Sequence, residues 1–237
     1  MAIYLLYFAI LLIIPIWAQL KVKAAYSKYS KIPSSSQMRG ADVARKILDE
    51  NGLYHVKVEE TQGILSDHYD PRTKTVRLSS DNYHGHSLAA AAVAAHECGH
   101  AIQDQEDYAF LRFRHALVPV ANLGSNLSWI FILIGIFTTL TEMFLLGIIF
   151  MAAGVLFQLV TLPVEFNASS RAMDQIVSLG IITNNEERQT RKVLSAAAMT
   201  YVAAAAVACC WLVTGTQLLA QERPQPDPAA LFDRLDA

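Results

Sequence analysis

Apolar residues dominate four long stretches of the chain, and the segments between them mix charged and apolar positions. Three stretches, Ala2–Leu20, Asn122–Leu140 and Met143–Pro163, carry no charged residue. Each has about 20 residues, the length of helix that crosses the hydrocarbon core of a bilayer. The fourth, Ala196–Ala220, is rich in alanine, and a buried helix of a soluble core is its alternative interpretation. The pattern predicts a mainly α-helical integral membrane protein with about four transmembrane helices.

Between the first and second apolar stretches, the pattern of apolar and polar residues predicts a small α+β unit. Apolar residues recur at helical spacing over Met38–Glu50. Short alternating stretches then predict three strands, near Val56–Glu59, Ile64–His68 and Lys74–Leu78. We expect them to form an antiparallel meander with one free edge strand. That edge either holds an extended peptide through main-chain hydrogen bonds or only supports the helix that follows, and the sequence favours neither.

The basic residues are distributed unevenly and predict a topology. Thirteen of the 19 Lys and Arg lie within Lys21–Arg114, and four more lie within Arg171–Lys192. Since Lys and Arg accumulate on the cytoplasmic side of membrane proteins, we expect both segments in the cytoplasm and the N-terminus outside. A cleaved signal peptide would need positive charge before its apolar run, so we expect residues 1–20 to remain as an anchor.

These patterns divide the chain into six predicted parts. They are an anchor (1–20), a cytoplasmic catalytic segment (21–118), a transmembrane hairpin (119–164), a cytoplasmic helical segment (165–195), a transmembrane helix (196–220) and a tail (221–237). The formal net charge of −2 argues against a nucleic-acid partner. Three cysteines give no disulfide framework.

The most specific local pattern is the run His96-Glu97-Cys98-Gly99-His100, in an alanine-rich stretch that predicts a helix from Ser87 to Gln105. Histidines four positions apart share one helix face, so both rings can reach one zinc ion at about 2.0–2.1 Å. Glu97 lies beside them and can take a proton from a zinc-activated water. A solvated surface helix is the alternative, but the preceding turns are almost wholly apolar.

A catalytic zinc ion usually has three protein ligands, and Glu165 is the predicted third. It follows the third apolar stretch directly, after Pro163. A carboxylate at the edge of a membrane span is costly unless it faces water or has a partner, and the zinc ion would be that partner. Snorkelling of the side chain to the interface is the alternative. His84 and His86 precede the motif helix and are expected at the surface.

The motif and its surroundings resemble a known family. The run His96–Gln103, with Ser66–Arg72 before it and Leu117–Asn122 after it, is similar to the YugP-type neutral zinc metallopeptidases of bacterial membranes. The likeness covers most of the chain, from the first apolar stretch to the fourth. It implies one zinc ion per chain and membrane-protein or peptide substrates, as in protein quality control.

More distantly, the chain resembles the HtpX/Ste24 membrane metalloproteases, in which a later Glu-x-x-Ala-Asp pattern completes the site. Glu165 and Ala168 match this pattern, but Ser169 stands in place of the Asp. The support that the Asp would give a ligand histidine is therefore not carried over. Asn167 or Asp174 is a weak candidate for that role. Arg171 either stabilises the oxyanion of the reaction, orients Glu165 or meets lipid headgroups.

The sequence thus predicts a membrane-embedded zinc metalloendopeptidase of the bacterial plasma membrane, with a zincin-like catalytic unit that faces the cytoplasm. His96, His100 and Glu165 would hold the metal and Glu97 would act as the base. The alternative is a non-catalytic scaffold that keeps zinc for structure. Structural zinc sites tend to have four protein ligands, often cysteines. Cys98 is near the motif but is expected to face away from the ligand histidines.

Overall fold

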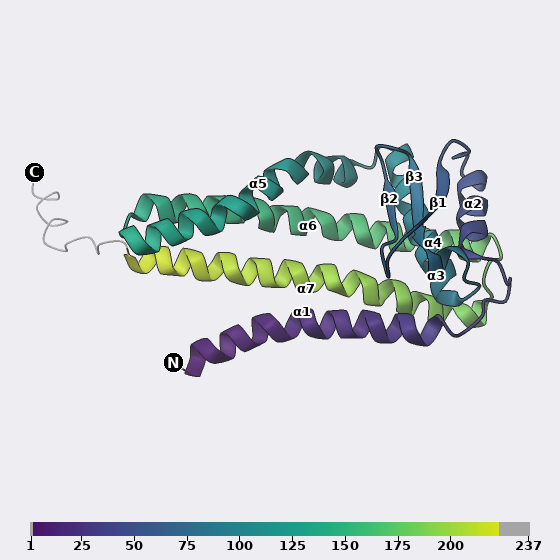
Figure 1. Cartoon of the computed structure of the whole chain (residues 1–237), viewed down its shortest axis with the longest axis horizontal. Helices are drawn as coiled ribbons and strands as arrows, with labels where there is room; N and C mark the ends of the chain where they lie inside the picture. Colours follow the sequence, from purple (N-terminus) through teal and green to yellow (C-terminus); the bar gives the residue numbers. More distant parts are fainter. Residues whose placement is uncertain (1, 223–237) are drawn as a thin grey trace, which may run out of the picture. The chain divides into compact units, whose positions relative to one another are not determined.

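The computed structural model describes residues 2–222 of the chain, and its helices and strands are drawn in Figure 1. Internal contacts divide these residues into two compact units. The first unit comprises the residues up to Ala116 together with Phe157–Val207, and the second comprises Leu117–Leu156 and the described residues from Ala208 onward. Apart from its first two residues, the expected tail (221–237) lies outside the described residues.

The elements of the chain are seven helices and three strands within the described residues. In chain order, the elements up to Gln105 are α1 (Ala2–Tyr29), α2 (Gly40–Glu50), β1 (Lys57–Thr61), β2 (His68–Asp70), β3 (Thr75–Ser79), α3 (Ser80–Tyr83) and α4 (Leu88–Gln105). Three long helices follow, and each contributes residues to both units: α5 (Ala109–Thr138), α6 (Thr141–Ser178) and α7 (Asn184–Glu222).

Four helices of the described chain are long and apolar enough to cross a membrane, which confirms the number predicted from the apolar stretches. They extend past those stretches into polar sequence. Helix α6 continues through Pro163 as far as Ser178, so Glu165 lies on an unbroken helix. The internal proline removes one backbone hydrogen bond, but the helix is continuous on both sides of it.

The sheet differs from the predicted antiparallel meander. Its strand order is β1-β3-β2, with β1 parallel to β3 and β2 antiparallel to β3. The most apolar strand takes the centre, because Val76 and Leu78 of β3 are fully buried whereas β1 is mostly exposed. The predicted strand at Ile64–His68 is also wrong, since β2 begins at His68 and the Ile64 side chain is 82% exposed.

Helix α4 is the centre of the first unit, and its predicted span is confirmed. Ser87 caps it, with Oγ accepting a hydrogen bond from the Ala90 amide at 3.1 Å. The alanines of its first turns are buried, and their small side chains let α2 pack closely, so that Val43 and Ile47 are fully buried. The sheet packs on α4 through β2 and β3 (Figure 1). The packing of α2 and of the sheet on α4 therefore sets the direction in which the face of α4 with His96 and His100 points.

The second unit is built by close packing of helices. A Cβ at Gly147 of α6 would stand 2.8 Å from the backbone nitrogen of Ile132 on α5. Small residues allow this approach between membrane helices. Ile132 also packs with Phe144 and Ile148 in a small buried cluster.

Candidate metal centre

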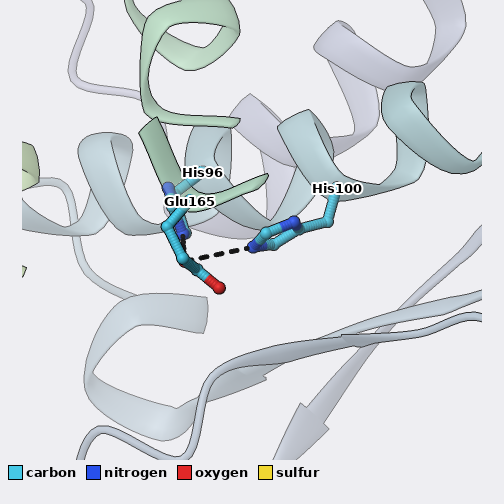
Figure 2. Close-up of side chains that lie close together, drawn as sticks. All are labelled: His96, His100 and Glu165. Atoms are coloured by element: carbon cyan, nitrogen blue, oxygen red, sulfur yellow. Dashed lines mark hydrogen bonds and ion pairs between the residues drawn. The ribbon is translucent and has the colours of Figure 1, made fainter. Parts of the chain in front are cut away.

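Two histidines and one glutamate converge inside the first unit. His96 and His100 lie one turn apart on α4, with their ring centroids 4.8 Å from one another, and Glu165 comes from α6. Figure 2 shows the three side chains pointing toward a common point. Glu165 Oε2 is 3.3 Å from His96 Nε2 and 3.6 Å from His100 Nε2. The Glu165 side chain is only 3% exposed, so the carboxylate is almost removed from water.

A glycine in the motif brings the two helices together. A Cβ at Gly99 would stand 2.6 Å from the carbonyl oxygen of Ala168 on α6, a separation that real Cβ atoms do not adopt. The absence of a side chain at Gly99 therefore permits backbone contact between α4 and α6. Ala168 is fully buried at this crossing, and Glu165 lies about one turn before it. The crossing point thus decides which α6 side chain meets the histidines.

The three donor atoms fit a metal ion. They lie within 4.8 Å of one another. A tetrahedral zinc ion with bonds of about 2.0–2.1 Å holds its donors roughly 3.3 Å apart, close to the two Oε2–Nε2 distances. Two imidazoles with one carboxylate are also a donor set that catalytic zinc sites use, with the fourth position left for water. A buried carboxylate needs compensation by positive charge, which a divalent cation would provide.

Glu97 lies beside the donor set and its environment favours the protonated form. Its side chain is buried, and this burial raises the pKa of Glu97 above the ordinary value of a glutamate, although His96 and His100 oppose the shift. A carboxyl group with a raised pKa exchanges protons more readily near neutral pH. The pKa of His100 is also raised: burial disfavours its charged ring, but the carboxylate of Glu165 outweighs that effect.

The group of His96, His100 and Glu165 opens into a cavity of about 150 Å³. Residues from several elements of the first unit line it: Asp67, His68, Tyr69, Pro71, His96, Glu97, His100, Leu111, Arg114, His115, Glu165 and Tyr201. β2 lies at the edge of the sheet and contributes His68 and Tyr69. An edge strand therefore borders the cavity, beside the candidate metal site.

The remaining predicted residues lie outside this cavity. Arg171 pairs with Glu106, with Nη2 and Oε2 at 2.7 Å, and its Nε donates to Asn167 Oδ1 at 2.7 Å. Asn167 also accepts a hydrogen bond from Gln103 Nε2 at 2.9 Å. Asp174 is exposed on α6. Asn167 is therefore linked to His100 only through Gln103.

Two direct partners of the histidines were not predicted. Ser169 Oγ lies 3.2 Å from His96 Nδ1, so the serine that stands in place of the Asp of the HtpX/Ste24 pattern does contact a histidine, contrary to the expectation. Gln103 Oε1 lies 3.0 Å from His100 Nδ1. Ser169 is four residues after Glu165 and Gln103 three after His100, spacings that share a helix face. Tyr201 comes from α7 and has no comparable local signal.

A His–His–Glu group that could hold a metal ion, on a chain with four helices of membrane-spanning length, is the combination expected of a membrane metalloprotein. The model of the family described as "Putative neutral zinc metallopeptidase" matches residues 4–219, and the chain belongs to this family. It is 55% identical over 191 residues to "Putative membrane protease YugP" of Bacillus subtilis (strain 168), a match that covers 81% of this chain and 85% of that protein. No solved structure matches the chain. The family predicted from the motifs is confirmed.

Proposed function

We propose that this protein is a membrane-embedded zinc metalloendopeptidase that hydrolyses peptide bonds of membrane-associated or misfolded proteins. The observation that carries the proposal is the convergence of His96, His100 and Glu165 beside Glu97, in a cavity bordered by an edge strand. Membership of a family described as zinc metallopeptidases supports the reaction class, and the name of the Bacillus relative supports a membrane protease.

In the proposed mechanism the three donors hold one zinc ion, which when bound supplies Lewis acidity toward water and the scissile carbonyl. Glu97 accepts a proton from the attacking water and passes it to the leaving amine. Its buried position suits both steps, because burial raises the pKa of Glu97 toward neutral pH, where a carboxyl group can both accept a proton and give it up again. The role of Glu97 thus follows from its place beside the donors.

The tetrahedral intermediate carries a negative oxygen that needs a hydrogen-bond donor. Arg171, the candidate from the sequence, is engaged by Glu106 and lies outside the cavity lining. Arg114 and Tyr201 line the cavity, and the Nε atom of Arg114 is buried with no hydrogen-bond partner among residues 2–222. We therefore assign the oxyanion to Arg114 or Tyr201.

β2 offers a means of holding the substrate. It has β3 on one side and no other strand on its outer edge within the described residues. An extended peptide can add to such an edge through main-chain hydrogen bonds. These bonds do not depend on the side chains of the peptide, so substrates of different sequence can bind in this way. A peptide paired with β2 at His68 and Tyr69 would place its backbone at the cavity that contains Glu97.

The proposal places the cavity at the cytoplasmic face of a bacterial plasma membrane, with several membrane-spanning helices. The distribution of Lys and Arg supports this orientation. Lys21 Nζ lies 4.7 Å from the ring centroid of Trp17, which is 50% exposed on α1. An exposed tryptophan under a lysine is typical of a membrane interface, and it marks the end of the first apolar stretch.

Purified full-length protein and its Glu97→Gln variant test the proposal. Both are expected to contain zinc, because the substitution spares the donors. Only the wild type is expected to cleave an unfolded protein such as casein, with turnover of the variant lower by about 10²–10⁴-fold. Wild-type protein that holds zinc without cleaving any unfolded or membrane protein would instead indicate the non-catalytic scaffold.

A further inference from the structure

Gln103 is a fully buried amide that contacts both helices of the candidate metal centre. Its Nε2 donates to the Val164 carbonyl oxygen at 2.8 Å and to Asn167 Oδ1 at 2.9 Å, both on α6. Its Oε1 lies 3.0 Å from His100 Nδ1. A buried amide is costly unless its polar atoms are paired, and here both ends of the side chain are satisfied.

The neighbours of Gln103 allow this amide only one orientation. A carbonyl oxygen only accepts hydrogen bonds, so the nitrogen end of Gln103 must face Val164. The guanidinium of Arg171 only donates, so the oxygen of Asn167 must face it. That same oxygen then accepts from Gln103. Glu106 holds the far side of Arg171 at 2.7 Å, which keeps the guanidinium in place.

The fixed orientation of Gln103 determines which nitrogen of His100 carries the proton. The oxygen end of Gln103 faces Nδ1 of His100 and only accepts, so Nδ1 must be the donor. In a neutral ring the lone pair then lies on Nε2, the atom 3.6 Å from Glu165 Oε2. We propose that Gln103 is a positioning residue that, with Asn167 and Arg171, fixes the tautomer of His100 so that Nε2 binds the metal.

The same side chain orients the third ligand. Val164, whose carbonyl accepts from Gln103, is the residue directly before Glu165. Gln103 therefore ties the α6 segment that carries Glu165 to the helix that carries His100. Partners of this kind, which hold metal ligands in place, commonly change metal affinity when they are lost. This inference rests on the proposed zinc site and adds a residue set to it.

The first test replaces Gln103 with methionine in the full-length protein. Gln103→Met keeps the approximate volume and removes all three hydrogen bonds, and Gln105→Met is the control because Gln105 is exposed two residues later on α4. Zinc dissociation constants are measured by competition with a chelator. We expect Gln103→Met to weaken zinc binding by about 10–100-fold and to alter the visible spectrum of the cobalt-loaded protein. The control is expected to match the wild type.

The second test separates the hydrogen-bond role from simple packing. Asn167→Asp keeps an oxygen that accepts from Gln103 and Arg171, whereas Asn167→Leu removes it. We expect zinc binding near the wild-type level in Asn167→Asp and clearly weaker in Asn167→Leu, with unchanged thermal unfolding of the metal-free proteins as the check on folding. A pure packing role predicts the reverse, because it penalises the added charge.

Two results would overturn the inference: wild-type zinc affinity and cobalt spectrum in Gln103→Met, or tighter zinc binding by Asn167→Leu than by Asn167→Asp. The outcome is distinguishable from a failure of the proposed function. If wild-type protein binds no zinc, the proposed metal site itself is wrong. If wild-type protein binds zinc and the Gln103 and Asn167 variants behave contrary to expectation, only the positioning role is wrong.

Discussion

At the scale of single residues, the site contains one donor that costs free energy to bury. Glu165 is 3% exposed, and its compensation comes from two imidazoles on another helix. Such a carboxylate needs positive charge nearby. The burial of Glu165 is therefore stronger support for binding of a cation than its position after the third apolar stretch.

Glu165→Gln is expected to weaken zinc binding by at least about 10–100-fold, since a neutral amide replaces a charged donor, and turnover should fall with zinc content. Metal analysis of the purified protein measures the effect. Asp174→Asn removes a carboxylate from the same helix at an exposed position and should leave zinc content unchanged. Full zinc content and normal turnover in Glu165→Gln would exclude Glu165 as a ligand.

The motif by itself specifies only part of the site. His96, Glu97 and His100 were predicted together because four-residue spacing on a helix is a local property. Their partners Ser169 and Gln103 also lie three or four residues from a donor residue. Spacing alone does not show that either side chain contacts a histidine, so their roles could not be predicted. Ser169 differs from the Asp of the HtpX/Ste24 pattern, so the sequence did not predict its contact with His96 at 3.2 Å.

At the scale of elements, the crossing of α4 and α6 determines the site. Its closest point is Gly99 against Ala168, where a Cβ would stand 2.6 Å from a carbonyl oxygen. The two helices carry all three donor residues. A change in their separation would therefore move Glu165 relative to both histidines at once.

Gly99→Ala should destabilise the protein by about 1–3 kcal/mol through overpacking and reduce zinc binding, because α6 must move away from α4. Thermal unfolding and zinc titration measure the two effects. Gly154→Ala is the matched control, since nothing lies within 4 Å of its added Cβ on α6, and alanine favours the helix. Equal behaviour of the two variants would show that the crossing tolerates a side chain.

The sheet and α4 are also joined by a buried acid. The Asp104 side chain, 1% exposed, binds Lys74 Nζ at 2.5 Å and accepts a hydrogen bond from the hydroxyl of Tyr69 on β2 at 2.6 Å. Burial alone would raise the pKa of Asp104, but Lys74 and Tyr69 outweigh it and hold the pKa below the ordinary value. The carboxylate of Asp104 thus links β2, which borders the cavity, to α4.

This contact predicts acid sensitivity. Because the folded pKa of Asp104 lies below the unfolded value of about 3.9, its contribution is complete above that value and is lost as pH falls through the folded pKa. Asp104→Asn should lower the free energy of unfolding at neutral pH by about 1–3 kcal/mol and reduce its dependence on acid pH. Denaturant unfolding at neutral and acid pH measures both. An identical acid dependence in wild type and variant would contradict the assignment.

At the scale of the whole molecule, all residues of the candidate site belong to the first unit, although they come from both sides of a helical hairpin. Residues 117–156, which lie between α4 and Glu165 in sequence, belong to the second unit. The chain thus leaves the first unit and returns to it before the donor set is complete. The hairpin lies in the part of the chain that contains two of the four membrane-length helices.

The charge distribution predicts which face of the membrane carries the site. In a chain without Cys209 and Cys210, Tyr54→Cys and Asn185→Cys should be protected from a membrane-impermeant thiol reagent added to intact cells; both positions are exposed to solvent. Asp227→Cys, in the predicted external tail, should be labelled. Labelling at Tyr54→Cys and Asn185→Cys from outside, with protection at Asp227→Cys, would reverse the orientation.

The sequence by itself determined the features that depend on neighbouring residues. The number of membrane-length helices, the Ser87-capped motif helix with its bounds and the paired histidines follow from hydropathy and helical spacing, whereas the long helices extend beyond their predicted apolar stretches. Local periodicity sets them because a helix satisfies its own backbone hydrogen bonds whatever surrounds it.

Only the tertiary structure decided how distant segments meet. β3 took the centre of a mixed sheet because burial of Val76 and Leu78 outweighed the order of the strands in the chain. Glu165, predicted from position alone, reaches His96 across 69 residues of sequence because Gly99 admits α6. The orientation of His100 depends on Gln103 and on α6 together. Such contacts depend on the angle and separation at which helices pack, which residue spacing within one helix does not specify.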